Sequence, residues 1–438
     1  MSESGGPQNN VVRLLRWSEQ YFKTDMVYLA QGGFWLTLGT VSASIASLVL
    51  AVAFANLLHP ETYGVYKFVL SIVAILTLAT LPGIDTAYVR AVARGKENIF
   101  LPLLTEMRWG VLGAVASLTF AGYYFFQGNN MLALAFVVTA VFIPVMDPLA
   151  LYDQLFSGRR AFSTSTKLGL IARLATTLVI IGTLFFWPTL IAVLLAYLAG
   201  WTIIRGIFFW YSVKAYKPNQ ERDESIPTYG KHLTFMKGAG TIAGSLGSIL
   251  LFHVGGGSAL AIYTLALAPV EQLRGLLGFI EPLIFPKLAH DNWRVSSFSA
   301  FMRKTAGFFV VLGSGIAFYI VAAPFLFSLV FPKYAASIIY SQVLAPTLLL
   351  SASTLILSII LRAKGETRKL YISSIVSIIA TLAFTPLATY LLGIWGLIGS
   401  IFALKTVETL TLIYLTFRSA PFTENKNQSS EEENGTSE

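Results

Sequence analysis

A glutamate and an arginine, Glu271 and Arg274, stand near the middle of a long apolar segment, three residues apart. Residues at this spacing share one face of an α-helix, so the two side chains can meet. An ionisable group inside a bilayer needs a partner, water or a cavity. The arginine guanidinium is a planar fork that can donate two parallel hydrogen bonds to a phosphate. The pair is therefore a candidate anion site, and the alternative is an ion pair that locks this helix to a neighbour.

Other charges within apolar segments favour structural roles. Lys405 and Glu408 repeat the three-residue spacing, which predicts an ion pair within one helix. Arg173 and Arg205 stand nearer the polar ends of their segments, where the long arginine side chain can reach the membrane surface. We expect packing roles for both arginines.

Several kinds of chemistry are missing from the sequence. The chain has 0 Cys, which removes thiolate chemistry, disulfides and cysteine metal sites. The 4 His are scattered without metal-ligand spacing, and the G-x-x-x-x-G-K-[ST] phosphate loop is absent. We therefore expect no cofactor, no metal site and no ATP hydrolysis.

The composition places these residues in a membrane. Of the 438 residues 55% are hydrophobic and 12% are charged, and the mean hydropathy is +0.67. A soluble protein carries about 25% charged residues. The formal charge of +9 is explained by topology and by contact with anionic lipid, so we expect no nucleic-acid partner. The chain is predicted to be an all-α polytopic membrane protein.

Twelve segments are apolar and long enough to span the hydrocarbon as helices. They cover 33–57, 64–89, 100–126, 131–155, 168–186, 189–211, 234–254, 259–285, 306–330, 341–361, 370–391 and 394–417. Alternate breaks are very short, and of the 31 Lys and Arg only Lys67 and Lys333 lie beside them. Because basic loops stay in the cytoplasm, both termini are predicted to be cytoplasmic.

The longest internal break, 212–233, divides the chain into six-helix lobes at 27–211 and 234–417. We interpret 212–233 as a cytoplasmic linker. The N-terminal segment 1–26 has an apolar face over 11–22, which favours an interfacial helix; the alternative is a frayed tail. The polar, acidic segment 418–438 is predicted to be disordered.

In the order and spacing of several short motifs, the sequence resembles the oligosaccharide flippases of the polysaccharide transporter family, within the multidrug/oligosaccharidyl-lipid/polysaccharide (MOP) exporter superfamily. The resemblance covers about 28–417. It is carried by ANLLHPETYGVY at 55–66, LPGIDTAYVR at 81–90, IYTLA at 262–266, FPKLA at 285–289, AKGETR at 363–368 and LGIWGLIGS at 392–400. It implies a V-shaped pair of lobes around a cavity lined by the first, second, seventh and eighth helices.

The resemblance also implies roles for charged residues. In that packing Arg274 would meet the phosphate groups of the cargo, and Glu271 would hold Arg274 or take part in ion coupling. Asp85, Arg90 and Lys237 would face the cytoplasmic mouth; the alternative for these three is ordinary anchoring at the inner membrane surface. Pro82, Pro144, Pro148 and Pro282 are expected to kink helices near this mouth. Small residues along the seventh helix allow either tight packing or a hinge.

The function that follows is that of a flippase, not an enzyme. It would move a polyprenyl phosphate- or pyrophosphate-linked oligosaccharide to the outer leaflet of the plasma membrane by alternating access. The expected partners are this lipid-linked oligosaccharide, membrane lipids, a coupling ion (H⁺ or Na⁺) and glycosyltransferases or a polymerase of the same pathway. The alternatives are a drug/cation antiporter of the same superfamily and a membrane glycosyltransferase or polymerase, although the short outer loops argue against the latter.

Overall fold

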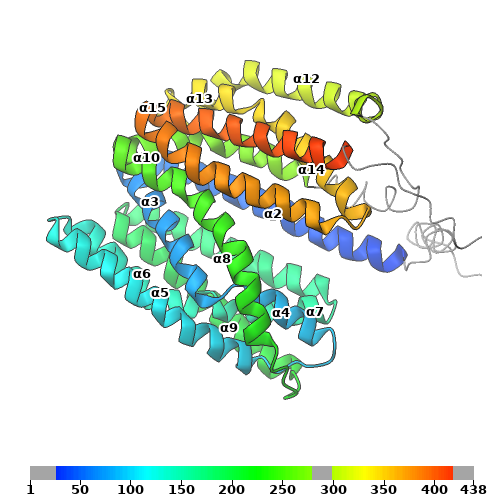
Figure 1. The fold of residues 1–438 in the computed structure, drawn as a ribbon. Coiled ribbons are helices and arrows are strands. Elements are labelled where there is room, and N and C mark those ends of the chain that lie inside the picture. The colour runs from blue at the N-terminus through cyan, green and yellow to red at the C-terminus, as the bar shows by residue number, and fades with distance from the viewer. Residues whose placement is uncertain (1–25, 279–297, 418–438) are drawn as a thin grey trace, which may run out of the picture.

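The computed structural model describes residues 26–278 and 298–417, and every regular element in these two ranges is helical (Figure 1). Ten helices in these ranges are long and apolar enough to cross a membrane. Large apolar side chains cover their outer faces; Phe126, Phe318 and Val321 are 89%, 76% and 80% exposed. Exposed apolar surface of this extent belongs in lipid. The predicted multi-pass membrane fold is confirmed.

Two of the ten helices are too long for one crossing. Helix α10 covers Ile226–Leu277 and α15 covers Thr367–Phe417, and 52 residues of helix extend about 78 Å, against about 30 Å of hydrocarbon. Each contains one glycine with positive φ and non-helical backbone, Gly256 (φ 75°) and Gly393 (φ 56°). Division at these glycines matches the ten spans to the twelve predicted crossings.

Two other crossings are interrupted. The second predicted segment forms α3 (Pro60–Leu76), the 3-10 turn η1 (Thr77–Thr80) and α4 (Gly83–Val92), with Leu81 left-handed at φ 63°. The fourth forms α6 (Asn130–Met146), η2 (Pro148–Ala150) and α7 (Leu151–Gly158). The expected interruptions at Pro82 and Pro148 are confirmed, whereas Pro144 lies inside α6. Pro282 lies outside the described residues.

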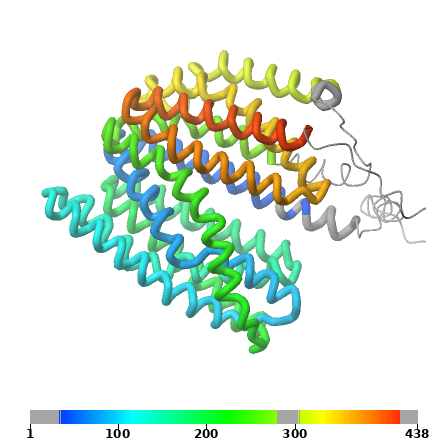
Figure 2. Tube along the Cα trace, in the orientation of Figure 1, coloured from blue at the N-terminus to red at the C-terminus, as the bar shows by residue number. Residues whose placement is uncertain are grey.

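The remaining crossings are single helices or a helix pair. They are α2 (Met26–Leu57), α5 (Phe100–Phe126), α8 (Phe162–Phe186), α9 (Leu190–Tyr216), α12 (Phe298–Val330), and α13 (Ser337–Leu344) with α14 (Thr347–Ala363). Connections 58–59, 127–129, 187–189 and 331–336 lie toward the left in Figures 1 and 2, and Gly256 lies beside Glu61 near the first of them. We call this the short-loop end. The opposite, basic end carries connections 93–99, 159–161, 217–225 and 364–366.

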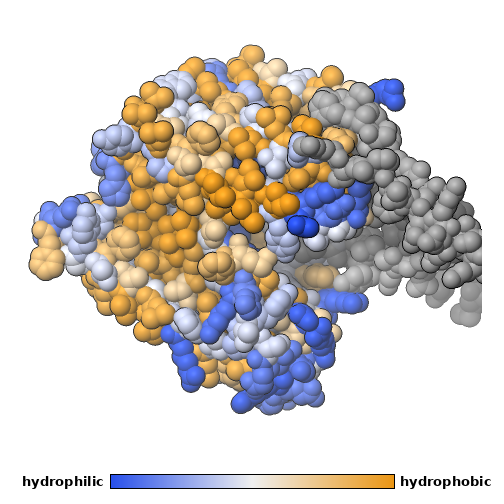
Figure 3. All heavy atoms as spheres, viewed as in Figure 1, coloured by the Kyte–Doolittle hydropathy of each residue, from blue (hydrophilic) through white to orange (hydrophobic). Residues whose placement is uncertain are grey.

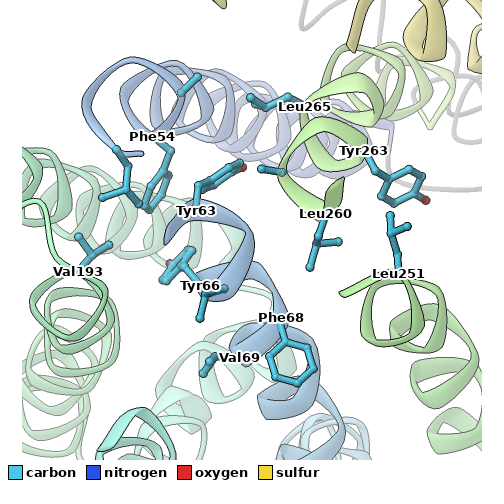
Figure 4. Packing of buried hydrophobic residues seen from close by; sticks show 14 of the residues in the cluster. Phe54, Tyr63, Tyr66, Phe68, Val69, Val193, Leu251, Leu260, Tyr263 and Leu265 are labelled. Carbon is cyan, nitrogen blue, oxygen red and sulfur yellow. The ribbon is translucent and has the colours of Figure 1, made fainter. Parts of the chain in front are cut away.

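Three buried clusters hold the helices together. One joins both halves of the chain near the short-loop end; Figure 4 shows part of it, with Phe54 and Tyr63 beside Leu260 and Leu265. Toward the basic end the core divides. One cluster contains Ile84, Tyr88, Phe156 and Phe209 together with Ile226 of α10, and another joins α14 to α15 through residues such as Leu357 and Leu412. Toward the basic end the first part of α10 therefore stays with the N-terminal half, through contacts such as Gly83 with Thr234, whereas α14 and α15 have a separate cluster.

The non-helical segment between the halves is shorter than the predicted linker 212–233, and hydrogen bonds hold it against a neighbouring loop. Helix α9 continues to Tyr216 and α10 begins at Ile226, which leaves 217–225 between them. Asn219 Nδ2 donates to the Gly95 carbonyl (2.7 Å), and Asn98 N donates to the Glu221 carbonyl (3.1 Å). These contacts fix 217–225 to the loop 93–99. The predictions for 1–25 of the N-terminal segment and for 418–438 lie outside the described residues.

Candidate functional site: intramembrane charges between two halves

Glu271 and Arg274 form the expected ion pair on the second half of α10. Arg274 Nη1 lies 2.5 Å from Glu271 Oε1, and the two side chains are 30% and 43% exposed. The Arg274 Nε is buried without an acceptor. The next residue, Gly275, faces Ser44 of α2. Arg274 is partly exposed and only its Nη1 bonds to Glu271 among the described contacts, so its other terminal N–H groups can donate to an anion without loss of that bond.

Lys67 on α3 is a second intramembrane cation. From the sequence alone we treated it only as a basic residue beside a short break and gave it no role. Its Nζ lies 5.5 Å from the centre of the Tyr63 ring, one turn earlier on the same helix face. None of the ion pairs in the described ranges includes Lys67. Its position inside a predicted helix, away from any carboxylate at helical spacing, was the available signal.

The three predicted mouth residues lie on α4 and the first half of α10, which pack together at the basic end. Lys237 Nζ donates to Thr86 Oγ1 (3.2 Å), next to Asp85, and the Arg90 guanidinium lies 5.0 Å from the Tyr229 ring centre. Asp85 is half-buried, whereas Arg90 and Lys237 are exposed. No described contact joins these residues to Glu271 or Arg274, so the structure places the five predicted residues in two groups.

Glycines allow α4 to approach α10 closely. Gly83 N donates to Thr234 Oγ1 (2.8 Å). A Cβ built on Gly83 would lie 2.3 Å from the Gly230 carbonyl oxygen, so only glycine fits there without movement of the backbone. The residues of LPGIDTAYVR that carried the family resemblance therefore form a helix contact between α4 and α10.

The short-loop end is closed by polar contacts that the sequence did not reveal. The Glu61 carboxylate on α3 accepts the backbone N–H groups of Gly257 (3.0 Å) and Ser258 (2.7 Å). These are the first free N–H groups of the helix after Gly256. Asn56 on α2 donates to the Val330 carbonyl (2.9 Å) and its own carbonyl accepts from Lys333 Nζ (2.6 Å). We call these two sets of contacts the short-loop latch.

Acidic residues lie inside the first half of the chain. Glu106 on α5 is 2% exposed, and its Oε1 has no hydrogen-bond partner among the described residues.

Arg205, for which we expected a packing role, pairs with Asp147 at 2.7 Å and also donates to the Met146 carbonyl (2.9 Å). The predicted pair Lys405–Glu408 is confirmed at 2.8 Å.

Arg159 joins the loop 93–99 to the end of α9, next to the connection 217–225. Arg159 donates from Nε and Nη2 to the two Glu97 carboxylate oxygens (2.7 and 2.6 Å) and from Nη1 to the Tyr216 carbonyl (3.2 Å). These hydrogen bonds lower the pKa of Glu97 below its ordinary value and raise that of Arg159. The fork joins α7, the loop 93–99 and the end of α9.

The chain matches one known protein family. The family model described as polysaccharide biosynthesis protein matches residues 29–290. A comparison with curated proteins finds no significant match.

Solved structures share the fold. The lipid II flippase MurJ, in an inward closed conformation, is 12% identical, with a TM-score of 0.68 over 88% of this chain and 87% of that one. An outward-facing MATE-family multidrug resistance transporter of the MOP superfamily is 13% identical (TM-score 0.56; 89% and 94% covered). A MOP-superfamily transporter from Pyrococcus furiosus is 14% identical (TM-score 0.54; 90% and 96% covered). At these identities the likeness establishes the fold.

Proposed function

Because this chain belongs to the polysaccharide biosynthesis protein family and has the fold of MOP-superfamily transporters, we propose that it is a flippase for a lipid-linked oligosaccharide. The cargo is a polyprenyl phosphate- or pyrophosphate-linked oligosaccharide that moves from the cytoplasmic to the outer leaflet. The product feeds the assembly of a cell-surface polysaccharide or glycan.

The observation that carries this proposal is the unequal closure of the two ends. At the short-loop end the halves share one hydrophobic cluster and the short-loop latch, whereas toward the basic end the N-terminal half together with the first part of α10 has one cluster and α14 with α15 has another. This arrangement supports alternating access, with the described state open toward the basic, cytoplasmic end. A polar sugar head enters between the halves there, while the lipid tail stays in the bilayer. Figure 3 displays hydrophilic residues gathered at that end and an apolar band beside them.

The intramembrane cations support an anionic cargo. Arg274 is partly exposed and bonds to Glu271 through Nη1 alone among the described contacts, and Lys67 has no carboxylate partner among the described ion pairs. Both interact favourably with a phosphate or diphosphate, since arginine supplies a fork and lysine a point charge. A transporter for cationic drugs is expected to present the opposite polarity. We assign Arg90 and Lys237 to the first contact of the cargo at the mouth, and Asp85 to the same interface.

Deletion of the gene tests the proposal directly. Lipid-linked glycans should accumulate in the inner leaflet, where mass spectrometry identifies them and an impermeant glycan-modifying reagent applied from outside fails to reach them. Restoring the wild-type chain should return them to the outer leaflet. Unchanged glycan export in the deletion strain, with no accumulated lipid-linked glycan, would contradict the proposal.

A further inference from the structure

A carboxyl group without a partner lies inside the first half of the chain. Glu106 on α5 is 2% exposed, its Oε1 makes no hydrogen bond, and no ion pair of the described ranges includes it. An isolated buried carboxylate is strongly disfavoured, and such a group normally neutralises itself. In a membrane-spanning segment this position also points to a function.

Glu106 lies beside both interrupted crossings. Gly110, one turn further along α5, packs against Thr80 at the end of η1 and against Pro144 of α6. On one side the chain leaves helical geometry at Leu81, and on the other α6 gives way at Asp147 to the 3-10 helix η2. Both α4, which carries Asp85, and η2, which Asp147 precedes, contact α5.

The charges around Glu106 are mostly acidic. The groups that interact with it electrostatically are Asp85 and Asp147. Arg205 on α9 is already engaged by Asp147 and by the Met146 carbonyl. From α10, Lys237 bonds to Thr86 Oγ1 and Lys231 lies over the Trp109 ring at 4.5 Å. On α7, Asp153 accepts from Ser165. Three carboxyl groups, on Asp85, Glu106 and Asp147, thus lie near two cations, Arg205, which is paired with Asp147, and Lys237, which is bonded to Thr86.

We propose that Glu106 and Asp85 form a proton-binding site within the first half of the chain. Three carboxylates that share two cations are stabilised when one of them, here the buried and unpaired Glu106, holds a proton. Binding forms an O–H bond on the Glu106 carboxylate, and in the described state the proton is exchanged with water at the basic end through half-buried Asp85. Within 26–278 and 298–417 no three His, Cys, Asp or Glu converge as metal ligands. The geometry therefore favours a proton over a metal ion.

Protonation of this site affects the contact between α4 and α10. Asp85 stands two residues after Gly83, which is bound to Thr234, and next to Thr86, which is bound to Lys237. When Glu106 holds the proton, Asp85 stays charged, attracts Lys237 and holds the two helices together; while the proton passes through Asp85, that attraction is released. The inference that the proton drives transport rests on the proposed function; the existence of the site does not.

Infrared difference spectroscopy of the purified full chain, between about pH 5 and about pH 9, tests the site without any cargo. The wild type should show the band of a protonated carboxyl group at neutral pH. Glu106→Gln should lose that band, and Glu408→Gln, which alters an ion-paired intramembrane glutamate, should retain it. Asp85→Asn should keep the Glu106 band but shift the pH at which it disappears.

Two results would overturn the proposal: a neutral-pH band that is unchanged in Glu106→Gln, or a band removed by Na⁺ at constant pH, which would indicate a metal ion. A second measurement uses proteoliposomes that carry a fluorescent polyprenyl diphosphate oligosaccharide. Glu106→Gln should translocate it but lose the stimulation by a pH gradient. If the wild type moves no such lipid while the infrared result holds, the proposed function fails and the proton site remains.

Discussion

Glu61 and Ser258, 197 positions apart in the chain, meet at the short-loop end, where Glu61 Oε2 accepts both the backbone N–H and the hydroxyl of Ser258 at 2.7 Å. Together with the bond from Lys333 to the Asn56 carbonyl, this contact joins the first half of the chain to the second. The proposed alternating access would require these bonds to break during each cycle.

Locking this contact should stop transport. The chain has 0 Cys, so Glu61→Cys with Ser258→Cys introduces the only two thiols. A short, reducible methanethiosulfonate cross-linker should abolish glycan export, and reduction should restore it. Each single variant, treated identically, serves as the control and should keep the activity that it has before treatment. Full export by the cross-linked double variant would show that this end does not open.

Gly64 should tolerate no side chain. A Cβ at this position would lie 1.8 Å from the Gly257 carbonyl oxygen, which is backbone and cannot turn aside. Gly64→Ala should therefore separate α3 from α10 and lower stability by at least the roughly 1–3 kcal/mol typical of overpacking. The matched control is Gly122→Ala on α5, where a Cβ meets nothing within 4 Å. Melting temperatures of the two purified variants in detergent give the comparison.

The fork between Arg159 and Glu97 should contribute pH-dependent stability. Its hydrogen bonds lower the pKa of Glu97 from an ordinary value of 4.5. The contribution is therefore fully present above that ordinary value and is lost as the pH falls through the lowered pKa. Arg159→Ala should destabilise by about 1–3 kcal/mol at neutral pH, as expected for a hydrogen-bonded charge pair.

The difference between Arg159→Ala and the wild type should shrink as the melting experiment is repeated at lower pH. Lys96→Ala is the control, because Lys96 is 43% exposed and lies 3.9 Å from Asp223. Its effect should be near zero at every pH. A difference between Arg159→Ala and the wild type that is constant with pH would contradict the prediction.

Substitutions at Arg274 separate a cargo role from a structural one. If Arg274 binds phosphate, Arg274→Ala should abolish export at nearly normal protein levels, and Arg274→Lys should restore it only in part because the fork is lost. The double variant Glu271→Gln, Arg274→Gln removes both charges of the pair and should also be inactive. The equivalent Lys405→Gln, Glu408→Gln variant should export normally. Full export by the Glu271, Arg274 double variant would refute the cargo role.

Local patterns predicted a large part of this fold, because hydropathy identifies membrane crossings and helical spacing identifies neighbours on one helix. The pairs Glu271–Arg274 and Lys405–Glu408 could be predicted for that reason. So could the breaks at Pro82 and Pro148, since proline disrupts a helix locally.

Contacts between distant segments could not be predicted in the same way. Arg205 and Asp147 are 58 positions apart, and Arg159 and Glu97 are 62 apart. The sequence displays these charges but not the helix packing that pairs them. Glu106 resembled any glutamate near a helix start, and only the packing of α5 against α6 and η1 shows that it is buried.

The cap that Glu61 provides has a consequence for how the short-loop end opens. When α3 leaves α10, the backbone N–H groups of Gly257 and Ser258 lose their acceptor and need another polar group at once. Glu61 is exposed, so the nearest replacement is water from the adjacent aqueous phase. We expect α3 and α10 to separate first at the short-loop end, where water is available, and then progressively deeper as water enters between them. Lipid chains cannot accept hydrogen bonds, so their entry between α3 and α10 would leave the same N–H groups without a partner. We therefore expect water, and not lipid, to enter between the two helices as they separate.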